Sequence, residues 1–257
     1  LIYSHMHNEV TELNTLNRMY DYISGSGFTM PGYPQRSLFS IPFMGLNNEG
    51  LPTFLDQDGN VSVTGINMQE YDPERLKFLK YEGPVDPTDV GSLGNVFRYK
   101  GVTLNLFITY SFGNVVRLDP VFSSSYSDLT ATPKEFKDRW VKPGDENFTN
   151  VPVIASKQQL NNIAYLSTAY QAYNYSTERV AKGDFIRMKE ISLGYEFPKS
   201  ITQPLRLSNL SLKLMATNLF LIYADKKLNG QDPEFFNAGG VANPMPKQFT
   251  LTLKLGI

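Results

Sequence analysis

Two histidines and a glutamate near the start of the chain are residue types that bind metal ions. His5 and His7 are one residue apart, so a strand would place both imidazoles on one side, with Glu9 next along that side. They are the only histidines of the chain, and the segment has the character of a strand end that enters a loop. We therefore interpret them as surface residues, and we expect no metal site and no cofactor.

Two groups of carboxylates could also support chemistry. The run DQDGN from Asp56 to Asn60 has the oxygen-bearing side chains of a calcium loop, but its glycine comes too early for an EF-hand. We predict a polar turn there. Asp225, Asp232 and Glu234 could serve in acid–base chemistry, yet no nucleophile or third group accompanies them. We interpret these three as solvated surface, and we predict that the chain is not an enzyme.

An aromatic group lies in the longest segment without strand character. Rings of this kind stack on sugars and pack against protein partners equally well. They are therefore possible contacts to a ligand or a partner, although packing of the segment onto itself or onto a partner is the interpretation we prefer for most of them. The residues are Trp140, Tyr165, Tyr170, Tyr173 and Tyr175.

The composition excludes several classes of protein. The 257 residues carry a formal net charge of −1 and form no run of lysine and arginine, which argues against nucleic-acid binding. Cysteine is absent, so no disulfide or cysteine-based metal site can form. No stretch reaches the roughly 18 consecutive apolar residues that a membrane helix needs. A mean hydropathy of −0.28 is compatible with a membrane barrel, because half of each barrel strand is polar.

The elements that would position these residues are strands with one apolar and one polar face. The last nine residues, FTLTLKLGI from Phe249 to Ile257, alternate without a fault. Tilted in a bilayer, such a strand spans roughly 23 Å, close to the apolar band of an outer-membrane barrel. Similar patterns recur at 102–112, 185–197 and 210–222, with a bulge expected near Asn218 and a hairpin turn at Lys100-Gly101.

The placement of side chains along these strands suggests a bilayer. Strand centres are aliphatic, whereas rings gather near strand ends, as in two aromatic girdles around a lipid-facing band. The alternation predicts that one set of side chains faces lipid. These residues are Leu104, Leu106, Ile108, Leu193, Leu212, Leu214, Leu251 and Leu253. A soluble β-domain also alternates, so the pattern alone leaves both possibilities open.

Loop lengths favour the barrel. Short turns alternate with two long segments, 113–183 and 224–247, as periplasmic turns alternate with extracellular loops in bacterial barrels. We expect both long segments to lie outside the cell and the C-terminus to lie in the periplasm. A structureless loop of this length is unusual in a compact domain. The helical character of 133–140 and 156–164 predicts internal structure in the first segment.

Several runs, in order along the chain, resemble the SusC/RagA-type TonB-dependent transporters of Bacteroidetes. The similar runs are GYPQRSLFSIPFMGLNNEGLPTFLDQDGN from Gly32, GNVFRYKGVTLNLFITYSFGN from Gly94, KGDFIRMKEISLGYEFP from Lys182, LKLMATNLF from Leu212, GQDPE from Gly230 and NPMPKQFTLTLKLGI at the end. The resemblance covers most of the chain.

The resemblance implies the C-terminal portion of an all-β, transmembrane, antiparallel barrel. Residues 1–257 would supply roughly 8–10 strands of a 22-stranded plugged barrel in the outer membrane of a Gram-negative cell. The implied partners are outer-membrane lipid, the remaining N-terminal barrel and plug of the same transporter, a SusD-like lipoprotein, and TonB through the plug, which we expect to lie outside this chain.

The function that the resemblance implies is TonB-dependent uptake of oligosaccharides or peptides. Two alternatives remain open: an outer-membrane porin-like barrel without TonB coupling, and a secreted β-rich carbohydrate-binding module.

Overall fold

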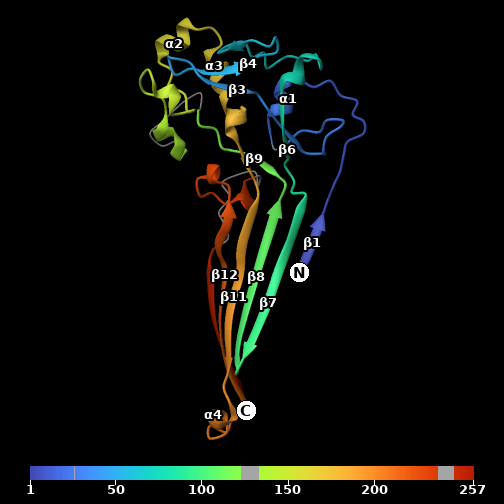
Figure 1. The fold of residues 1–257 in the computed structure, drawn as a ribbon, viewed down its shortest axis with the longest axis vertical. Helices are drawn as coiled ribbons and strands as arrows, with labels where there is room; N and C mark the ends of the chain where they lie inside the picture. Colours follow the sequence, from blue (N-terminus) through green and yellow to red (C-terminus); the bar gives the residue numbers. More distant parts are fainter. Residues whose placement is uncertain (26, 123–132, 237–245) are drawn as a thin grey trace.

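The computed structural model describes residues 1–25, 27–122, 133–236 and 246–257. It shows a long curved sheet with a lobe of short elements at one end (Figure 1). We call the sheet the wall. Its six strands run in the order β1-β7-β8-β11-β12-β13, and every neighbouring pair is antiparallel. The strands are β1 (Ile2–His5), β7 (Asp89–Tyr99), β8 (Val102–Phe112), β11 (Phe185–Glu196), β12 (Asn209–Ala224) and β13 (Gln248–Gly256).

Short connections join the wall strands at the end away from the lobe. Lys100 and Gly101 form the β7–β8 turn with positive φ angles of 45° and 83°, the conformation of a tight hairpin whose twist matches its strands. The β11–β12 connection contains only the short helix α4 (Lys199–Thr202). The predicted hairpin and the predicted alternation of short and long connections are therefore confirmed.

The lobe is built from the described residues of two segments, 8–88, which precedes β7, and 113–183, which follows β8. The first part contains α1 (Met19–Ile23), β2 (Ser37–Ser40), β3 (Phe43–Leu46), β4 (Pro52–Leu55), β5 (Val61–Ser62), η1 (Arg75–Phe78) and β6 (Lys80–Pro84). The second contains β9 (Val115–Arg117), η2 (Lys134–Asp138), η3 (Asp145–Asn147), α2 (Lys157–Asn162), α3 (Leu166–Asn174), η4 (Thr177–Arg179) and β10 (Val180–Lys182). The helical character predicted near 133–140 and 156–164 is confirmed by η2 and α2.

One hydrophobic core joins the two parts of the lobe. Met19, Ile41 and Phe54 come from the first part, and Leu166 and Tyr173 from the second; all are at most 1% exposed. Backbone hydrogen bonds also cross between the parts, from the amide of Ile41 to the carbonyl of Tyr175 (3.1 Å) and from that of Thr177 to the carbonyl of Ile41 (3.0 Å). The two segments therefore fold as one unit.

This arrangement corrects the expected number of barrel strands. The all-β barrel-segment architecture is confirmed, but among the residues that the structure describes the wall has six strands, fewer than the eight to ten expected. The difference comes from residues 37–62, whose short strands pair with one another or with β6 inside the lobe. Strands of two to four residues are too short to cross a bilayer. No helix within the described residues is long and apolar enough to cross a membrane.

Candidate functional site

The wall has an apolar face formed by rows of side chains that cross the strands. Phe97, Leu104, Leu193, Leu214 and Leu251 occupy one row, because each is paired with the next in the strand register. The neighbouring rows contain the other leucines and the isoleucine predicted to face lipid: Leu106, Ile108, Leu212 and Leu253. Leu251 and Leu253 remain 68% and 59% exposed, although both are large and apolar. A surface of this kind matches the lipid-facing side of a barrel.

Aromatic rings border this apolar face at both ends. Tyr99 pairs with Val102, which pairs with Tyr195, in the row nearest the short turns. Tyr110 pairs with Ile186 near the lobe, where Tyr110 and Phe112 stack with ring centroids 5.6 Å apart. The girdle pattern is thus present, with aliphatic rows between its two parts.

The opposite face of the wall is polar. One of its rows contains Asn105 and Ser192, and the Asn105 amide donates to the Ser192 hydroxyl at 3.0 Å. The next row toward the short turns contains Arg98, Thr103 and Lys213. In a closed barrel this face lines the interior, because lipid-facing and interior-facing residues alternate along each strand.

A bulge interrupts the alternation of β11 and β12 where the sequence predicts one. The register shifts between Met188 and Glu190, and Asn218 has a φ of 53°. The extra residues keep Met188 and Phe220 on the apolar side and Arg187 on the polar side. The bulge therefore extends the two-faced pattern up to the lobe.

Most of the predicted contact residues pack inside the lobe. Tyr173 is fully buried, and Tyr170 is 8% exposed and donates its hydroxyl proton to the carbonyl of Val153 at 2.6 Å. Trp140 is also 8% exposed, and its indole N–H donates to Glu146 at 2.8 Å. This burial agrees with the preferred interpretation, in which most of the rings pack the segment onto itself, and contact of these three rings with a ligand or a partner stays a prediction. Their large apolar areas build the core.

The other two predicted contact residues are more accessible. Tyr165, at the start of α3, is 73% exposed, so contact with a partner remains a prediction for this ring. Tyr175 is partly buried, beside Tyr20 (hydroxyl oxygens 3.5 Å apart) and under the guanidinium of Arg117. Burial, helped by the Tyr20 hydrogen bond, raises the pKa of Tyr175 to about 12, so the phenol stays neutral at physiological pH.

Two arginines stabilise the lobe near the wall, Arg117 between its two parts and Arg179 within the second part. Arg117 donates to the carbonyl of Phe39 (2.5 Å) and to the hydroxyl of Ser40 (3.2 Å). Burial lowers the pKa of Arg117 to about 10, while nearby Glu82 acts in the opposite direction, so the side chain remains charged at neutral pH. Arg179, 3% exposed, pairs with Glu135 at 3.1 Å. Sequence patterns do not reveal these residues, because single arginines between strands carry no periodic signal.

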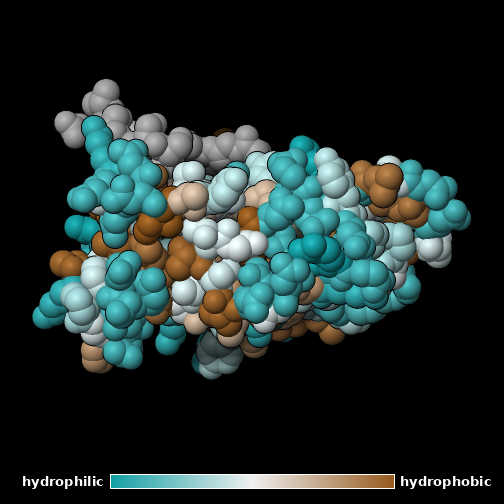
Figure 2. All heavy atoms as spheres, turned by 90° about the horizontal axis from the view of Figure 1, so that it is seen from above, coloured by the Kyte–Doolittle hydropathy of each residue, from teal (hydrophilic) through white to brown (hydrophobic). Residues whose placement is uncertain are grey.

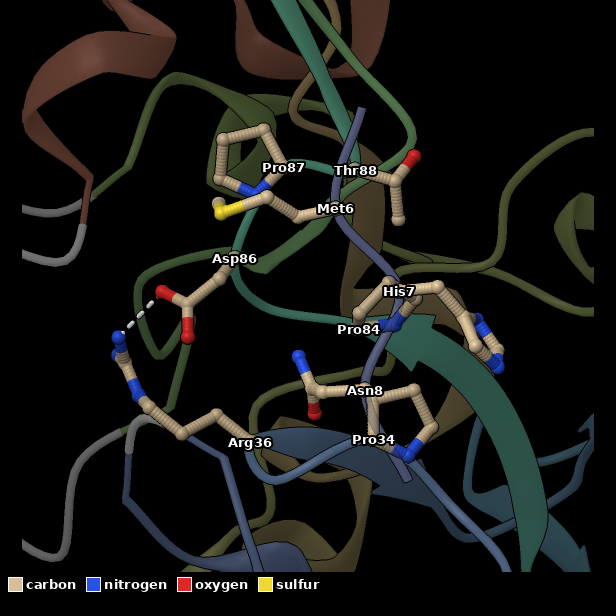
Figure 3. Close-up of a pocket in the computed structure, with 9 residues that line it drawn as sticks. All are labelled: Met6, His7, Asn8, Pro34, Arg36, Pro84, Asp86, Pro87 and Thr88. Atoms are coloured by element: carbon tan, nitrogen blue, oxygen red, sulfur yellow. Dashed lines mark hydrogen bonds and ion pairs between the residues drawn. The ribbon is translucent and has the colours of Figure 1, made fainter. Parts of the chain in front are cut away.

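The residues considered for metal binding have other roles in the structure. The His5 Nδ1 atom lies 2.8 Å from a carboxylate oxygen of Asp89. His7 lines a cavity of about 40 Å³ between the wall and the lobe, beside the ion pair of Arg36 and Asp86 (2.5 Å; Figure 3). A cavity of this size is far smaller than the roughly 300–1,000 Å³ of typical ligand pockets.

The two carboxylate groups differ in their surroundings. Asp56 accepts the backbone N–H groups of Asp58 (3.0 Å) and Asn60 (2.9 Å) and the hydroxyl of Ser62, so the predicted polar turn is confirmed. The prediction of solvated surface is wrong for Asp232, which is 11% exposed and pairs with Arg187 on the polar face of the wall.

The chain has relatives among TonB-dependent receptors. It is 28% identical over 195 residues to "TonB-dependent receptor P39" of Formosa agariphila, an alignment that covers 74% of this chain and 16% of the relative. The chain is thus similar to a TonB-dependent receptor over most of its own length. The resemblance predicted from the sequence is confirmed. No protein-family model matches the chain.

Solved structures of a peptide importer have the same fold. The chain superposes on the RagAB importer in its "open-open" state with a TM-score of 0.59 and 20% identity, covering 88% of this chain and 23% of that one. The "closed-closed" state gives a TM-score of 0.57 with 22% identity over 88% of this chain and 23% of that one. The chain therefore spans 16% of the length of the TonB-dependent receptor and 23% of the length of the importer chain.

Proposed function

We propose that the chain forms part of the barrel wall and an extracellular lobe of a TonB-dependent importer of oligosaccharides or peptides. The observation that carries this proposal is the wall itself, with an apolar face bordered by rings, a polar face opposite, and a lobe at one end only. The sequence relative is a TonB-dependent receptor, and the structures of similar fold are those of a peptide importer, which favours uptake over a passive pore.

The proposed orientation places the lobe outside the cell. In this orientation 113–183 and 224–247 are the long extracellular loops expected from the sequence, whereas the short turns and the C-terminal end of β13 face the periplasm. The two outer strands of the wall need further neighbours, because within the described residues β13 pairs only with β12 and the four-residue β1 covers only part of β7. In this proposal the rest of the same transporter supplies these strands, and its plug supplies the contact to TonB.

A SusD-like lipoprotein is the proposed partner of the lobe. Seen from above, the lobe is mostly hydrophilic with separate hydrophobic spots (Figure 2). Phe148 and Val141 are among the most exposed apolar side chains of the second part, at 90% and 67%. Both flank the turn at Asp145, whose carboxylate accepts the N–H of Val141 at 3.1 Å. Exposed apolar side chains on a fixed turn are suitable anchors for a protein partner.

Uptake by the full-length protein tests the proposed function. A strain that expresses it with its neighbouring lipoprotein should accumulate labelled oligosaccharides or peptides, and deletion of TonB should abolish the accumulation. Equal uptake with and without TonB would favour the porin-like alternative. Recovery of the full-length protein in the soluble fraction without detergent would favour the secreted module.

Single substitutions test the proposed partner surface. Phe148→Ser should reduce the amount of lipoprotein that copurifies with the full-length barrel, because it removes an exposed apolar anchor without disturbing the core. Leu205→Ser is the matched control, since Leu205 is 59% exposed and lies in the short connection between α4 and β12. Equal recovery of the lipoprotein with both variants would exclude Phe148 from the interface.

A further inference from the structure

Arg187 is a buried arginine on the polar face of the wall. It pairs with Thr109 of β8 and Leu221 of β12, in a row close to the lobe. Its side chain is only 7% exposed. A guanidinium buried to this degree needs charged or hydrogen-bonding partners, because removing it from water is costly.

Two carboxylates from the loop after β12 supply those partners. The Arg187 Nη2 atom lies 2.5 Å from Asp232 Oδ1, and Nε lies 3.2 Å from Glu234 Oε2. The Asp232 side chain is 11% exposed, whereas Glu234 is 41% exposed, so the contact to Asp232 is the shielded one. Attraction between shielded charges is weakened less by salt than attraction at the surface.

The loop that carries these carboxylates is held at several points. We call residues 225–236 the clamp loop; it contains η5 (Lys226–Leu228) and η6 (Pro233–Phe235). Asp232 Oδ1 also accepts the N–H of Glu234 at 3.1 Å, which fixes the turn that presents both carboxylates. At the other end of the loop, Asp225 Oδ2 accepts the N–H of Lys182 at 2.9 Å, and Leu228 is 1% exposed in a small core.

The small core attaches the clamp loop to the lobe. Leu228 packs there with Val116, Leu118 and Ala181, which come from β9, the residue after it, and β10. The clamp loop therefore contacts the lobe on one side and the polar face of β11 on the other. A loop lying along the outer side of the wall could not reach Arg187, because successive side chains of a strand point to opposite faces.

We infer that the clamp loop folds inward over the polar face of the wall and narrows the entrance to the barrel, with Arg187 as the positioning residue. The inference rests on the proposed function, since only a barrel that admits a solute has an entrance to narrow. It makes the clamp loop a determinant of the size of solute that passes. Asp232 and Glu234 are then positioning residues as well, because they hold the loop.

Cysteine labelling of the full-length transporter in intact cells tests the inference. Thr250 lies on the polar face in the row of Ser192 and Met215, farther from the lobe than Arg187. Thr250→Cys, in a background without other cysteines, would be labelled from outside with a small sulfonated maleimide and with a maleimide carried on a polyethylene glycol chain. The readout is the rate of labelling with the large maleimide divided by the rate of labelling with the small one, which we call the large-to-small ratio. Asn48→Cys, exposed on the lobe, reports labelling that the clamp loop does not control.

Arg187→Gln should raise the large-to-small ratio at Thr250→Cys by at least about tenfold, because a buried pair that loses one partner releases the segment it holds. Asp232→Asn should do the same if Arg187→Gln fails to assemble. Arg98→Gln removes a positive charge from the same face near the short turns and should leave the ratio unchanged. At Asn48→Cys the ratio should not respond to any of these changes.

An unchanged ratio in assembled Arg187→Gln and Asp232→Asn barrels would overturn the inference, and so would an equal rise in Arg98→Gln. The measurement needs neither substrate nor TonB. If the large-to-small ratio rises in Arg187→Gln but the protein shows no TonB-dependent uptake, the narrowing of the entrance by the clamp loop is supported and the proposed function is rejected.

Discussion

A methyl group added at Gly50 should destabilise the lobe more than the same change at a comparable glycine. Gly50 has a φ of +75°, and an ideal Cβ there would lie 2.4 Å from Cδ2 of Trp140 and 2.6 Å from its Cε3. The indole cannot retreat easily, because it is 8% exposed and its N–H is bonded to Glu146. The backbone of Gly50 is also held in place, because its carbonyl accepts the N–H of Val153 at 3.0 Å.

The magnitude has two parts. An alanine in the left-handed region costs roughly 1–2 kcal/mol. Forcing a group into a packed core costs about 1–3 kcal/mol more. Gly50→Ala should therefore cost roughly 2–5 kcal/mol in the free energy of lobe opening. Gly59→Ala is the control: its φ is +79°, but an added Cβ would meet nothing within 4 Å. It should show the backbone cost alone.

Hydrogen exchange of the full-length protein measures this difference. Peptides that cover 140–153 should exchange about 5- to 150-fold faster in Gly50→Ala than in Gly59→Ala, the ratio that corresponds to the steric term of about 1–3 kcal/mol. Equal exchange in the two variants would refute the argument, because it would mean that the indole moves aside without cost. Adding Trp140→Ala to Gly50→Ala should remove the extra cost, so the two changes should not be additive.

Two further predictions concern the wall and the pH dependence of the lobe. Leu253→Arg should lower the free energy of unfolding of the barrel, measured in lipid, by about 2–4 kcal/mol. Thr252→Arg, on the polar face, should lower it much less. Equal losses in the two variants would contradict the assignment of the two faces. The indole N–H of Trp140 lowers the pKa of Glu146, so the carboxylate favours the folded lobe above its unfolded pKa near 4.5, and this stabilisation should be lost as the pH falls through the lower folded pKa. Trp140 fluorescence between neutral and acidic pH should show the loss, and Glu146→Gln should remove that part of the pH dependence.

The two-faced strands could be predicted from the sequence because their period is local. Alternation in Phe249–Ile257 and 102–112 identifies the apolar face without any knowledge of neighbours. Antiparallel pairing then follows from the Lys100-Gly101 turn, and Asn218 indicated the bulge because it breaks the apolar face. These features depend on residues within a few positions of one another.

The lobe could not be predicted in the same way, because its core is not local. Residues such as Ile41 and Tyr173 meet in this core although they are more than a hundred positions apart, with the β7–β8 hairpin between them in the sequence. The helix α3 was not predicted, although its buried side chains follow the helical spacing i, i+3, i+4, i+7: Leu166, Ala169, Tyr170 and Tyr173. Arg187 and Asp232 are 45 positions apart, and a charged side chain gives no sign of its burial in the sequence.

The shared core of the lobe has a consequence for chimaeric transporters. Loop exchange between related barrels assumes that each surface loop can be transplanted as an independent cassette. Here residues 8–88 and 113–183 complete each other's interior, so grafting either one alone would leave half a core facing water. The transporter from which the loops are taken must therefore supply both segments together. An insertion in one segment is tolerated only where it does not disturb the packing of that segment against the other.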